Sequence, residues 1–364
     1  MRRLTKTPAS DIARPEAAIG GGRASGVNRH AERIMRLATG AVMMQAVAVA
    51  AELDLADLLA SGPLPVADLS HATGCPEGPL RRLLRSLASM GLCEQRDGDC
   101  FSLTSAGRLL QGGTGASLHD WAIWCGRHLW TQWGNLKHSL KTGKSVRQVM
   151  TRRPIWDHLD EDAETAAVFD GAMAELTRFG AASVLACYDF SRANVVADIA
   201  GGCGDLLQAI LSRYTGARGV LFDRPHAIDG ARKRFETSGL DTRCEFITGS
   251  FFDFVPPGAD VYLLKNVLHD WDDERCIEIL RRCRIAMGSH ARLLIVEGVL
   301  PSRWRNNVQH QNIAKRDLTM LVGPGGCERS EAEFCGLLTA TDFTCSKIVP
   351  AQFGLFVIEA LPGA

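Results

Sequence analysis

The sequence predicts an α/β fold with a doubly wound parallel sheet, preceded by a helical domain that has the outline of a winged helix. Three observations lead to this prediction. Strand-like and helix-like segments alternate after residue 188, a glycine-rich turn follows the first of these strands, and a helix–turn–helix–hairpin pattern lies before residue 115. Alternation of strands and helices at this spacing is typical of a parallel sheet covered on both faces.

The composition is that of an ordinary globular protein. The 364 residues are 46% hydrophobic and 23% charged, and 41 basic residues balance 41 acidic ones. A net charge of zero gives no global field that would favour nucleic acid or a membrane surface. The 12 cysteines form no C-x-x-C pair, no apolar run approaches the length of a membrane helix, and no apolar segment follows MRRLTK. We therefore expect a cytoplasmic protein with reduced thiols, no structural zinc and no membrane span.

The N-terminal region divides into a tail and a long apolar helix. Residues 1–27 are rich in Ala, Gly, Arg and Pro, so we expect a disordered tail. From Ala41, the stretch AVMMQAVAVAAELDLADLL is helical and apolar nearly all round. Such a helix needs burial on more than one side. Its extra face packs either against a second subunit or against the rest of the same chain.

Residues 28–115 are expected to form a winged-helix-like domain. Two helices are followed by a hairpin around Arg96–Asp99, and the second helix carries Arg81, Arg82 and Arg85. These arginines form either a DNA-recognition helix or the solvated face of a structural helix. The structural interpretation is favoured because the wing carries three acids that would repel phosphate: Glu94, Asp97 and Asp99.

Residues 116–187 are helical and rich in aromatic residues. Aromatic residues at helical spacing pack in a core more often than they line a binding site. Trp156, Phe169 and Met173 could nevertheless line a flat apolar pocket for an aromatic ligand. This segment is the predicted substrate pocket.

Residues 188–364 hold the predicted sheet. Its strands lie within NVVADI, GVLFD, CEFITGSFF, DVYLLKNVLHD and ARLLIVEGVL. Ligands of such sheets bind at the carboxyl ends of the strands, beside the point where the strand order reverses.

A glycine-rich turn and an acid suggest an adenosine-containing ligand. Gly201, Gly202 and Gly204 allow a tight turn and close approach of the backbone, and Asp223 ends the second strand, where it can bind ribose hydroxyls. Both features suit NAD as well as S-adenosylmethionine. The third glycine of the dinucleotide pattern is replaced by Leu207, which favours an adenosyl ligand without phosphates.

The chain resembles the S-adenosylmethionine-dependent O-methyltransferases of the plant caffeate and bacterial natural-product type. The resemblance rests on DIAGGCG, LFDRP, GSFFDFVPPGADVYLLKNVLHDWDDE, LLIVEGVLP, RDLTMLV and PGGCERSEAEF, and extends from Ala41 to the C-terminus. It implies a Rossmann-like catalytic domain with an antiparallel C-terminal hairpin, and a homodimer joined through the N-terminal domain. It also implies S-adenosylmethionine as cofactor without a metal, and an aromatic small-molecule acceptor.

The resemblance also implies roles for individual residues. Gly202 and Gly204 would pass under the methionine part of the cofactor, and Asp223 would bind its ribose. The remaining assignments are Phe251 on the adenine face, Lys265 beside the cofactor, His269 as general base flanked by Glu297 and Glu328, Met173 and Met320 gripping the substrate, and Asp317 nearby.

Three positions depart from the family pattern. Ala200 replaces the first glycine of the loop, Cys203 stands where Thr or Arg is common, and Ser250 replaces an acid that accepts from the adenine amino group. A hydroxyl accepts a hydrogen bond more weakly than a carboxylate does. The adenine contact at Ser250 is therefore expected to be weaker.

The stretch VYLLKNVLHDWDDE contains the predicted base. In a parallel sheet, the fourth and fifth strands are neighbours, so His269 after one meets Glu297 at the end of the other. A carboxylate fixes the histidine tautomer and stabilises the imidazolium. A histidine with a pKa near 6.5 can take the proton of a phenol during transfer. The alternative is a structural histidine that caps the next helix, although Asp270 or Asp272 would cap it better.

The sequence thus predicts a methyltransferase that acts on a phenolic hydroxyl of a flat aromatic molecule. Methyl transfer to nitrogen or carbon on the same scaffold is the alternative within the enzymes. The alternative from another class is a winged-helix transcriptional regulator with a sensory α/β domain.

Overall fold

The computed structural model describes residues 26–152 and 156–363. The predicted tail, residues 1–27, therefore lies almost wholly outside the described residues. The described residues divide between two compact units, one that ends at Met43 and one that begins at Met44. Helix α1 (Gly26–Ala38) belongs to the first unit, and α2 (Gly40–Glu52) crosses the boundary between them.

The helical run Val27–Glu52 is long and apolar enough to cross a membrane, judged by length and composition alone. No segment of this kind was expected from the sequence, because the expectation counted unbroken apolar residues, whereas a helical run also admits a few polar ones. Large apolar side chains on α1 are exposed, among them Ile34 and Leu37. Exposed apolar surface of this kind is also typical of a helix that packs against a second subunit.

The winged-helix-like part of the second unit follows the sequence prediction. A three-stranded antiparallel sheet, in the order β1-β3-β2, packs with its helices around a core that includes Leu84 and Phe101. Arg81 pairs with Glu77 and with Asp99 of the wing, in agreement with the structural interpretation of this helix. The elements are α3 (Leu55–Leu58), β1 (Leu64–Pro65), α4 (Val66–Thr73), α5 (Glu77–Ser89), β2 (Cys93–Arg96), η1 (Asp97–Asp99), β3 (Cys100–Leu103) and η2 (Gly107–Leu110).

The aromatic segment is helical, as predicted, but contains a turn of π-helix. This turn, η3 (Cys125–Leu129), joins α6 (His119–Trp124) to α7 (Trp130–Trp133). A Cβ atom on Gly126 would lie 2.2 Å from Cβ of Ala48, so only glycine fits where η3 passes α2. The helices that follow are α8 (Leu136–Thr142), α9 (Val146–Thr151), α10 (Asp157–Glu161) and α11 (Ala163–Cys187).

The main sheet has the strand order β10-β11-β8-β7-β4-β5-β6. Strands β4 to β8 on this path are parallel, and β10 and β11 form the expected antiparallel hairpin at one edge. A short strand, β9 (Arg329–Ser330), adds to the end of β8. The strands are β4 (Val195–Ile199), β5 (Arg218–Asp223), β6 (Cys244–Thr248), β7 (Val261–Lys265), β8 (Arg292–Leu300), β10 (Phe343–Pro350) and β11 (Leu355–Pro362).

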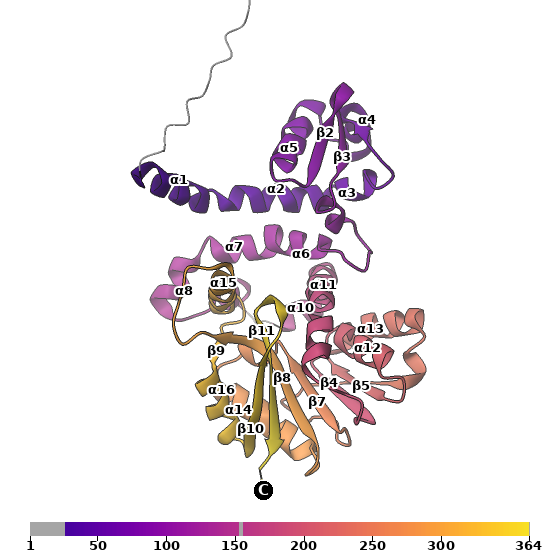
Figure 1. Ribbon diagram of the computed structural model, residues 1–364, viewed down its shortest axis with the longest axis vertical. Helices are drawn as coiled ribbons and strands as arrows, with labels where there is room; N and C mark the ends of the chain where they lie inside the picture. The colour runs from indigo at the N-terminus through magenta and orange to yellow at the C-terminus, as the bar shows by residue number, and fades with distance from the viewer. Residues whose placement is uncertain (1–25, 153–155, 364) are drawn as a thin grey trace, which may run out of the picture. The chain divides into compact units, whose positions relative to one another are not determined.

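Helices cover both faces of this sheet (Figure 1). One face packs against α11, α12 and α13, and the other packs against α14 and α16, so each face has its own apolar cluster. Strand β4 lies between β5 and β7, which places the reversal of strand order beside its carboxyl end. The helices are α12 (Asp205–Arg213), α13 (Pro225–Ser238), η4 (Asp241–Arg243), η5 (Leu268–Asp270), α14 (Asp273–Ala286), α15 (Val308–Val322), α16 (Glu331–Thr339) and η6 (Gln352–Gly354).

Candidate active site

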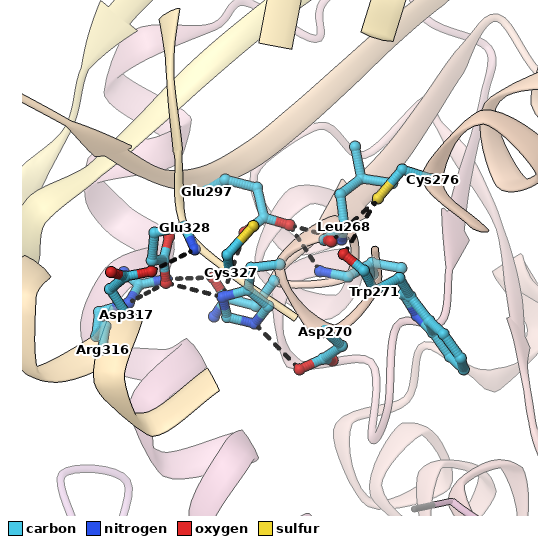
Figure 2. A network of polar contacts seen from close by, with 12 residues as sticks. Leu268, Asp270, Trp271, Cys276, Glu297, Arg316, Asp317, Cys327 and Glu328 are labelled. Carbon is cyan, nitrogen blue, oxygen red and sulfur yellow. Dashed lines mark hydrogen bonds and ion pairs between the residues drawn. The ribbon is translucent and has the colours of Figure 1, made fainter. Parts of the chain in front are cut away.

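His269 lies in a buried group of acids at the carboxyl edge of the sheet. Strands β7 and β8 pair in parallel with Lys265 opposite Val296, so the chain after β7 meets Glu297 in β8. His269 is 7% exposed, and its Nδ1 lies 2.9 Å from Oε1 of Glu328 and 3.5 Å from Oε2 of Glu297. In Figure 2, Glu328 lies with Arg316 and Asp317 toward the left of this polar network, Glu297 lies above its centre, and Asp270 lies toward the right.

The acids make His269 more basic than a free histidine. Burial lowers its pKa, but Glu297, Asp270 and Glu328 outweigh burial and raise the pKa to about 9. The ordinary pKa near 6.5 assumed from the sequence is therefore too low for this environment. Burial in turn raises the pKa of Asp270 to about 7, with His269 acting in the opposite direction.

The two glutamates differ in their surroundings. Burial raises the pKa of Glu297, whose Oε1 accepts the backbone N–H groups of Val267 and Leu268 at 2.8 and 2.9 Å. Burial also acts on Glu328, but the hydrogen bond and charge of His269, together with Arg316, hold its pKa below the usual value. Arg316 Nε lies 3.1 Å from Oε1 of Glu328. Glu328 is thus the ionised partner that favours the imidazolium.

His269 does not cap the helix that follows it. Asp272 caps α14 by accepting the backbone N–H of Arg275 at 2.9 Å, as the sequence argument favoured. Asp317, predicted near the substrate, accepts the backbone N–H of Glu328 at 3.0 Å and so holds the loop that carries this acid. Its substrate role stays a prediction.

The predicted cofactor residues lie along the carboxyl ends of adjacent parallel strands. After β4, the loop has positive φ at Gly202 and Gly204, and Gly202 donates its N–H to Oδ2 of Asp223 at 2.7 Å. A Cβ atom on Gly201 would lie 2.6 Å from Cγ of Asp198, so glycine is needed there for close packing. Ala200 adopts φ +56°, a left-handed conformation that a glycine would reach without the strain of a Cβ atom.

The chain after β6 and the end of β7 complete this edge. Ser250 Oγ accepts the backbone N–H of Phe252 at 3.2 Å, which closes a turn around Phe251. The Phe251 ring meets Trp271 edge-on at 6.0 Å. Lys265 donates from Nζ to Oγ1 of Thr177 at 3.0 Å, and burial lowers the pKa of Lys265 to about 8.

The predicted aromatic pocket residues form one cluster. The Phe169 ring meets Trp156 at 5.8 Å and Trp124 at 5.0 Å, and Met173 packs in the same cluster. Trp124 also borders a cavity of about 170 Å³ whose lining includes His128, Arg147, Met150 and Thr165. Met320 lies on α15, the helix that also carries Arg316 and Asp317.

The sequence reasoning missed three charged residues of this site. Asp270 was considered only as a helix cap, yet its Oδ1 lies 3.7 Å from Nε2 of His269, and adjacency in the chain was the available signal. Arg316 reaches both Glu328 and Oδ1 of Asn266, and stands next to the predicted Asp317. Nothing in the sequence pointed to Arg147, because a single arginine in a helix is usually exposed to solvent.

A metal ion is a possible occupant of the acidic group. Ligand-type atoms of His269, Glu297 and Glu328 lie within 4.8 Å of one another. Arg316 already places a cation against Glu328, and Glu297 already accepts two backbone N–H groups. The metal-free site expected from the resemblance stays a prediction.

Comparison with known proteins identifies the family. Residues 133–344 match the family model of the O-methyltransferase domain, and residues 35–112 match that of the O-methyltransferase dimerisation domain. The phenazine O-methyltransferase of Lysobacter antibioticus is 38% identical, covering 90% of this chain and 95% of the relative. The 8-amino-8-demethylriboflavin N,N-dimethyltransferase of Streptomyces davaonensis is 36% identical, covering 85% of this chain and 89% of the relative.

Solved structures show the same fold with cofactor bound. An O-methyltransferase from neocarzinostatin biosynthesis, in complex with S-adenosylmethionine and 2-hydroxy-5-methyl naphthoic acid, is 32% identical. It superimposes with a TM-score of 0.74, covering 88% of this chain and 96% of that structure. The match to the O-methyltransferase domain covers more than half of the chain, the dimerisation domain precedes it, and the relatives span most of the chain, which therefore belongs to the family of S-adenosylmethionine-dependent O-methyltransferases.

Proposed function

We propose that this O-methyltransferase methylates a phenolic hydroxyl of an aromatic natural product, with His269 as general base. When bound, S-adenosylmethionine supplies a sulfonium methyl group that is already activated for transfer. What the chain must add is in-line positioning and removal of the acceptor proton. The observation that best supports this proposal is the pairing of His269 Nδ1 with Glu328 at 2.9 Å.

This pairing supports Nε2 of His269 as the nitrogen that takes the acceptor proton. A proton on Nδ1 that is held by Glu328 leaves the lone pair on Nε2, on the opposite side of the ring. An acceptor hydroxyl that donates to Nε2 can then pass its proton to the ring as the methyl group arrives. Glu328 and Glu297 stabilise the imidazolium that results.

The raised pKa of His269 suits a phenol. A phenol has a pKa near 10, so a histidine of pKa 6.5 would accept its proton against a difference of about 3.5 units. With the pKa of His269 raised to about 9, the difference falls to about one unit, or roughly 1.4 kcal/mol. The same shift keeps the free ring largely protonated at pH 7, so activity should increase toward alkaline pH.

Transfer to nitrogen is the second candidate. It is favoured by the similarity to an N,N-dimethyltransferase of comparable identity and coverage. A neutral aromatic amine presents its lone pair without losing a proton first, so it needs no base before methyl transfer. Dependence on His269 therefore separates the two candidates.

The test is a methyl-transfer assay with labelled S-adenosylmethionine against matched phenols and anilines. We expect O-methylated products from the phenols. The His269→Ala variant should lose this activity and keep whatever activity the wild type has toward the anilines. Methylation of anilines alone, with phenols unchanged, would replace the proposal by N-methylation.

A further inference from the structure

Arg147 is a buried cation that has no acid bound to it. Arg147 is 7% exposed. Among the described residues, no side-chain or backbone oxygen accepts a hydrogen bond from its guanidinium. The contact recorded for the guanidinium is with the Trp124 ring, 5.6 Å from Cζ to the ring centroid. Burial lowers the pKa of Arg147 to about 10, and Asp270 opposes this only through longer-range attraction. Buried charges are normally paired, so an arginine in this state indicates an absent anionic partner.

The guanidinium borders the cavity beside the aromatic cluster. Arg147, Trp124, His128 and Thr165 all contribute to its lining, and none of the described lining residues is an acid. Arg127 also lines the cavity, but Glu52 and Glu164 already bind it, at 2.8 and 3.3 Å. Arg147 is thus the cation here that remains available to a ligand.

Helix α9 holds Arg147 in a fixed relation to the base. Ser145 caps α9 and donates its hydroxyl to the carbonyls of Val322 and Gly323. Gln148 donates from Nε2 to the carbonyl of Pro324 at 3.1 Å. The same segment packs against the base, because a Cβ atom on Gly326 would lie 2.2 Å from the carbonyl oxygen of His269. Residues 322–326 therefore contact both α9, which carries Arg147, and η5, which carries His269.

We propose that the acceptor is an aromatic carboxylic acid, whose carboxylate binds the Arg147 guanidinium while its hydroxyl faces His269. This inference rests on the proposed function, since it places the acceptor in this cavity. The planar guanidinium fork matches a carboxylate with two parallel hydrogen bonds, and the ring of the acceptor packs against Trp124, which lines the cavity and meets Phe169 edge-on behind it. A cavity of about 170 Å³ accommodates a single aromatic ring with small substituents, since about 150 Å³ is sufficient for benzene.

Matched pairs of acids and amides test this assignment. The ortho, meta and para hydroxybenzoates are compared with the corresponding hydroxybenzamides, which have the same shape and no charge, and two-ring hydroxynaphthoates with their amides. Turnover is measured with S-adenosylmethionine. Binding is measured separately by calorimetry on enzyme loaded with S-adenosylhomocysteine, so that affinity is known even for a compound that is not methylated.

For the wild type, we expect at least one acid to have a KM and Kd about 10- to 100-fold lower than its amide, the usual effect of a hydrogen-bonded ion pair. Arg147→Gln should abolish this preference by weakening the acid alone, and Arg147→Lys should restore part of it. Arg152→Gln is the matched control, because Arg152 follows the same helix, is exposed and lies outside the cavity lining. Melting curves establish that each variant is folded.

Two results would overturn the assignment. Acids and amides that bind the wild type equally well would show that no anion site exists. An equal loss for acids and amides in a folded Arg147→Gln variant would show that Arg147 only supports the pocket. If an acid binds with the predicted dependence on Arg147 but no phenol is methylated, the anion site stands and the proposed phenol methylation fails.

Discussion

At the scale of single residues, the proposed chemistry depends on how three acids surround His269. Glu328 lies 2.9 Å from Nδ1, Glu297 lies 3.5 Å from the same nitrogen, and Asp270 lies 3.7 Å from Nε2. Each acid favours the protonated ring. The neutral ring is therefore a strong base, but only a small fraction of His269 is neutral at pH 7.

Replacement of His269 by Ala should decrease kcat by about 10²–10⁴-fold, the usual contribution of a general base. The affinity for S-adenosylmethionine should hardly change, because the imidazole is expected to face the acceptor. The defect should shrink as the pH approaches the pKa of the phenol, where the phenolate forms without help. His269→Gln should show the same defect, since an amide cannot take a proton. Near-normal turnover of either variant at pH 7 would exclude His269 as the base.

Replacement of Glu328 by Gln should lower the pKa of His269, because the variant removes a negative charge that stabilises the imidazolium. The rising limb of the kcat/KM profile should then move toward acid by about one to two pH units, the equivalent of one hydrogen bond to a charged group. The maximum rate should fall, since the ring becomes a weaker base. Glu331→Gln, an exposed acid at the start of α16, is the control and should leave the profile in place. An unshifted profile in Glu328→Gln would mean that another group sets the pH dependence.

At the scale of elements, the segment from the end of α15 to Arg329, the first residue of β9, holds His269 in position. A Cβ atom on Gly326 would lie 2.2 Å from the carbonyl oxygen of His269 and 2.5 Å from the carbonyl carbon of Asp270. Arg329, at the end of the same segment, donates to the carbonyls of Leu268 and Trp271 at 2.9 and 2.8 Å. The short helix η5 is thus held by backbone packing as well as by the acids.

Gly326→Ala should displace η5, because both atoms that the new methyl would meet belong to the backbone. Overpacking of this kind costs about 1–3 kcal/mol of stability, and a misplacement of about 1 Å at the reacting groups lowers turnover by about a hundredfold. Gly336→Ala in α16 is the matched control, because nothing lies within 4 Å of its Cβ position and alanine favours the helix by up to about 1 kcal/mol. Denaturant titration and initial rates distinguish the two variants. A Gly326→Ala variant with wild-type stability and rate would show that the segment adapts freely.

The elements of the sheet were predictable, whereas one feature of the pocket was not. Strands such as β4 and β7 are short apolar runs followed by turns, so periodicity alone indicates them. The π-helical turn at Cys125–Leu129 leaves no such signal, because one extra residue in a helix does not change the composition.

The site was predictable where it depends on strand order. Parallel neighbours bring His269 and Glu297 together whatever the loops do. The raised pKa of His269 and the burial of Arg147 against Trp124 depend on side-chain packing between segments far apart in the sequence, which the sequence does not display.

At the scale of the whole molecule, the exposed apolar residues of α1 and α2 indicate a missing partner. The match of residues 35–112 to the O-methyltransferase dimerisation domain favours a second copy of the chain as that partner. Seven large apolar side chains of these two helices are exposed: Val27, Ile34, Met35, Leu37, Val42, Met43 and Val49.

We predict a homodimer that depends on these helices. Sedimentation at micromolar concentration should show a dimer for the wild type and for Ile285→Asp, whose side chain is 79% exposed on α14. The double change Ile34→Asp and Leu37→Asp should shift the protein toward monomer, because it would bring charges into an apolar interface. A wild-type monomer would contradict the prediction. Association of the wild type with neutral lipid vesicles in place of dimerisation would favour the membrane interpretation of Val27–Glu52.

The buried acids around His269 also bear on how the protein tolerates heat. Oε2 of Glu297 and Oε2 of Glu328 are buried, and no group in the described part of the chain donates a hydrogen bond to either. An unsatisfied buried acceptor costs about 1–3 kcal/mol, a large share of the margin that keeps a protein folded. Under the proposed function, the same two carboxylates strengthen His269 as a base. Selection for thermostability alone would therefore be expected to collect joint apolar replacements of Glu297 and Glu328, giving proteins that survive higher temperatures and have lost their turnover.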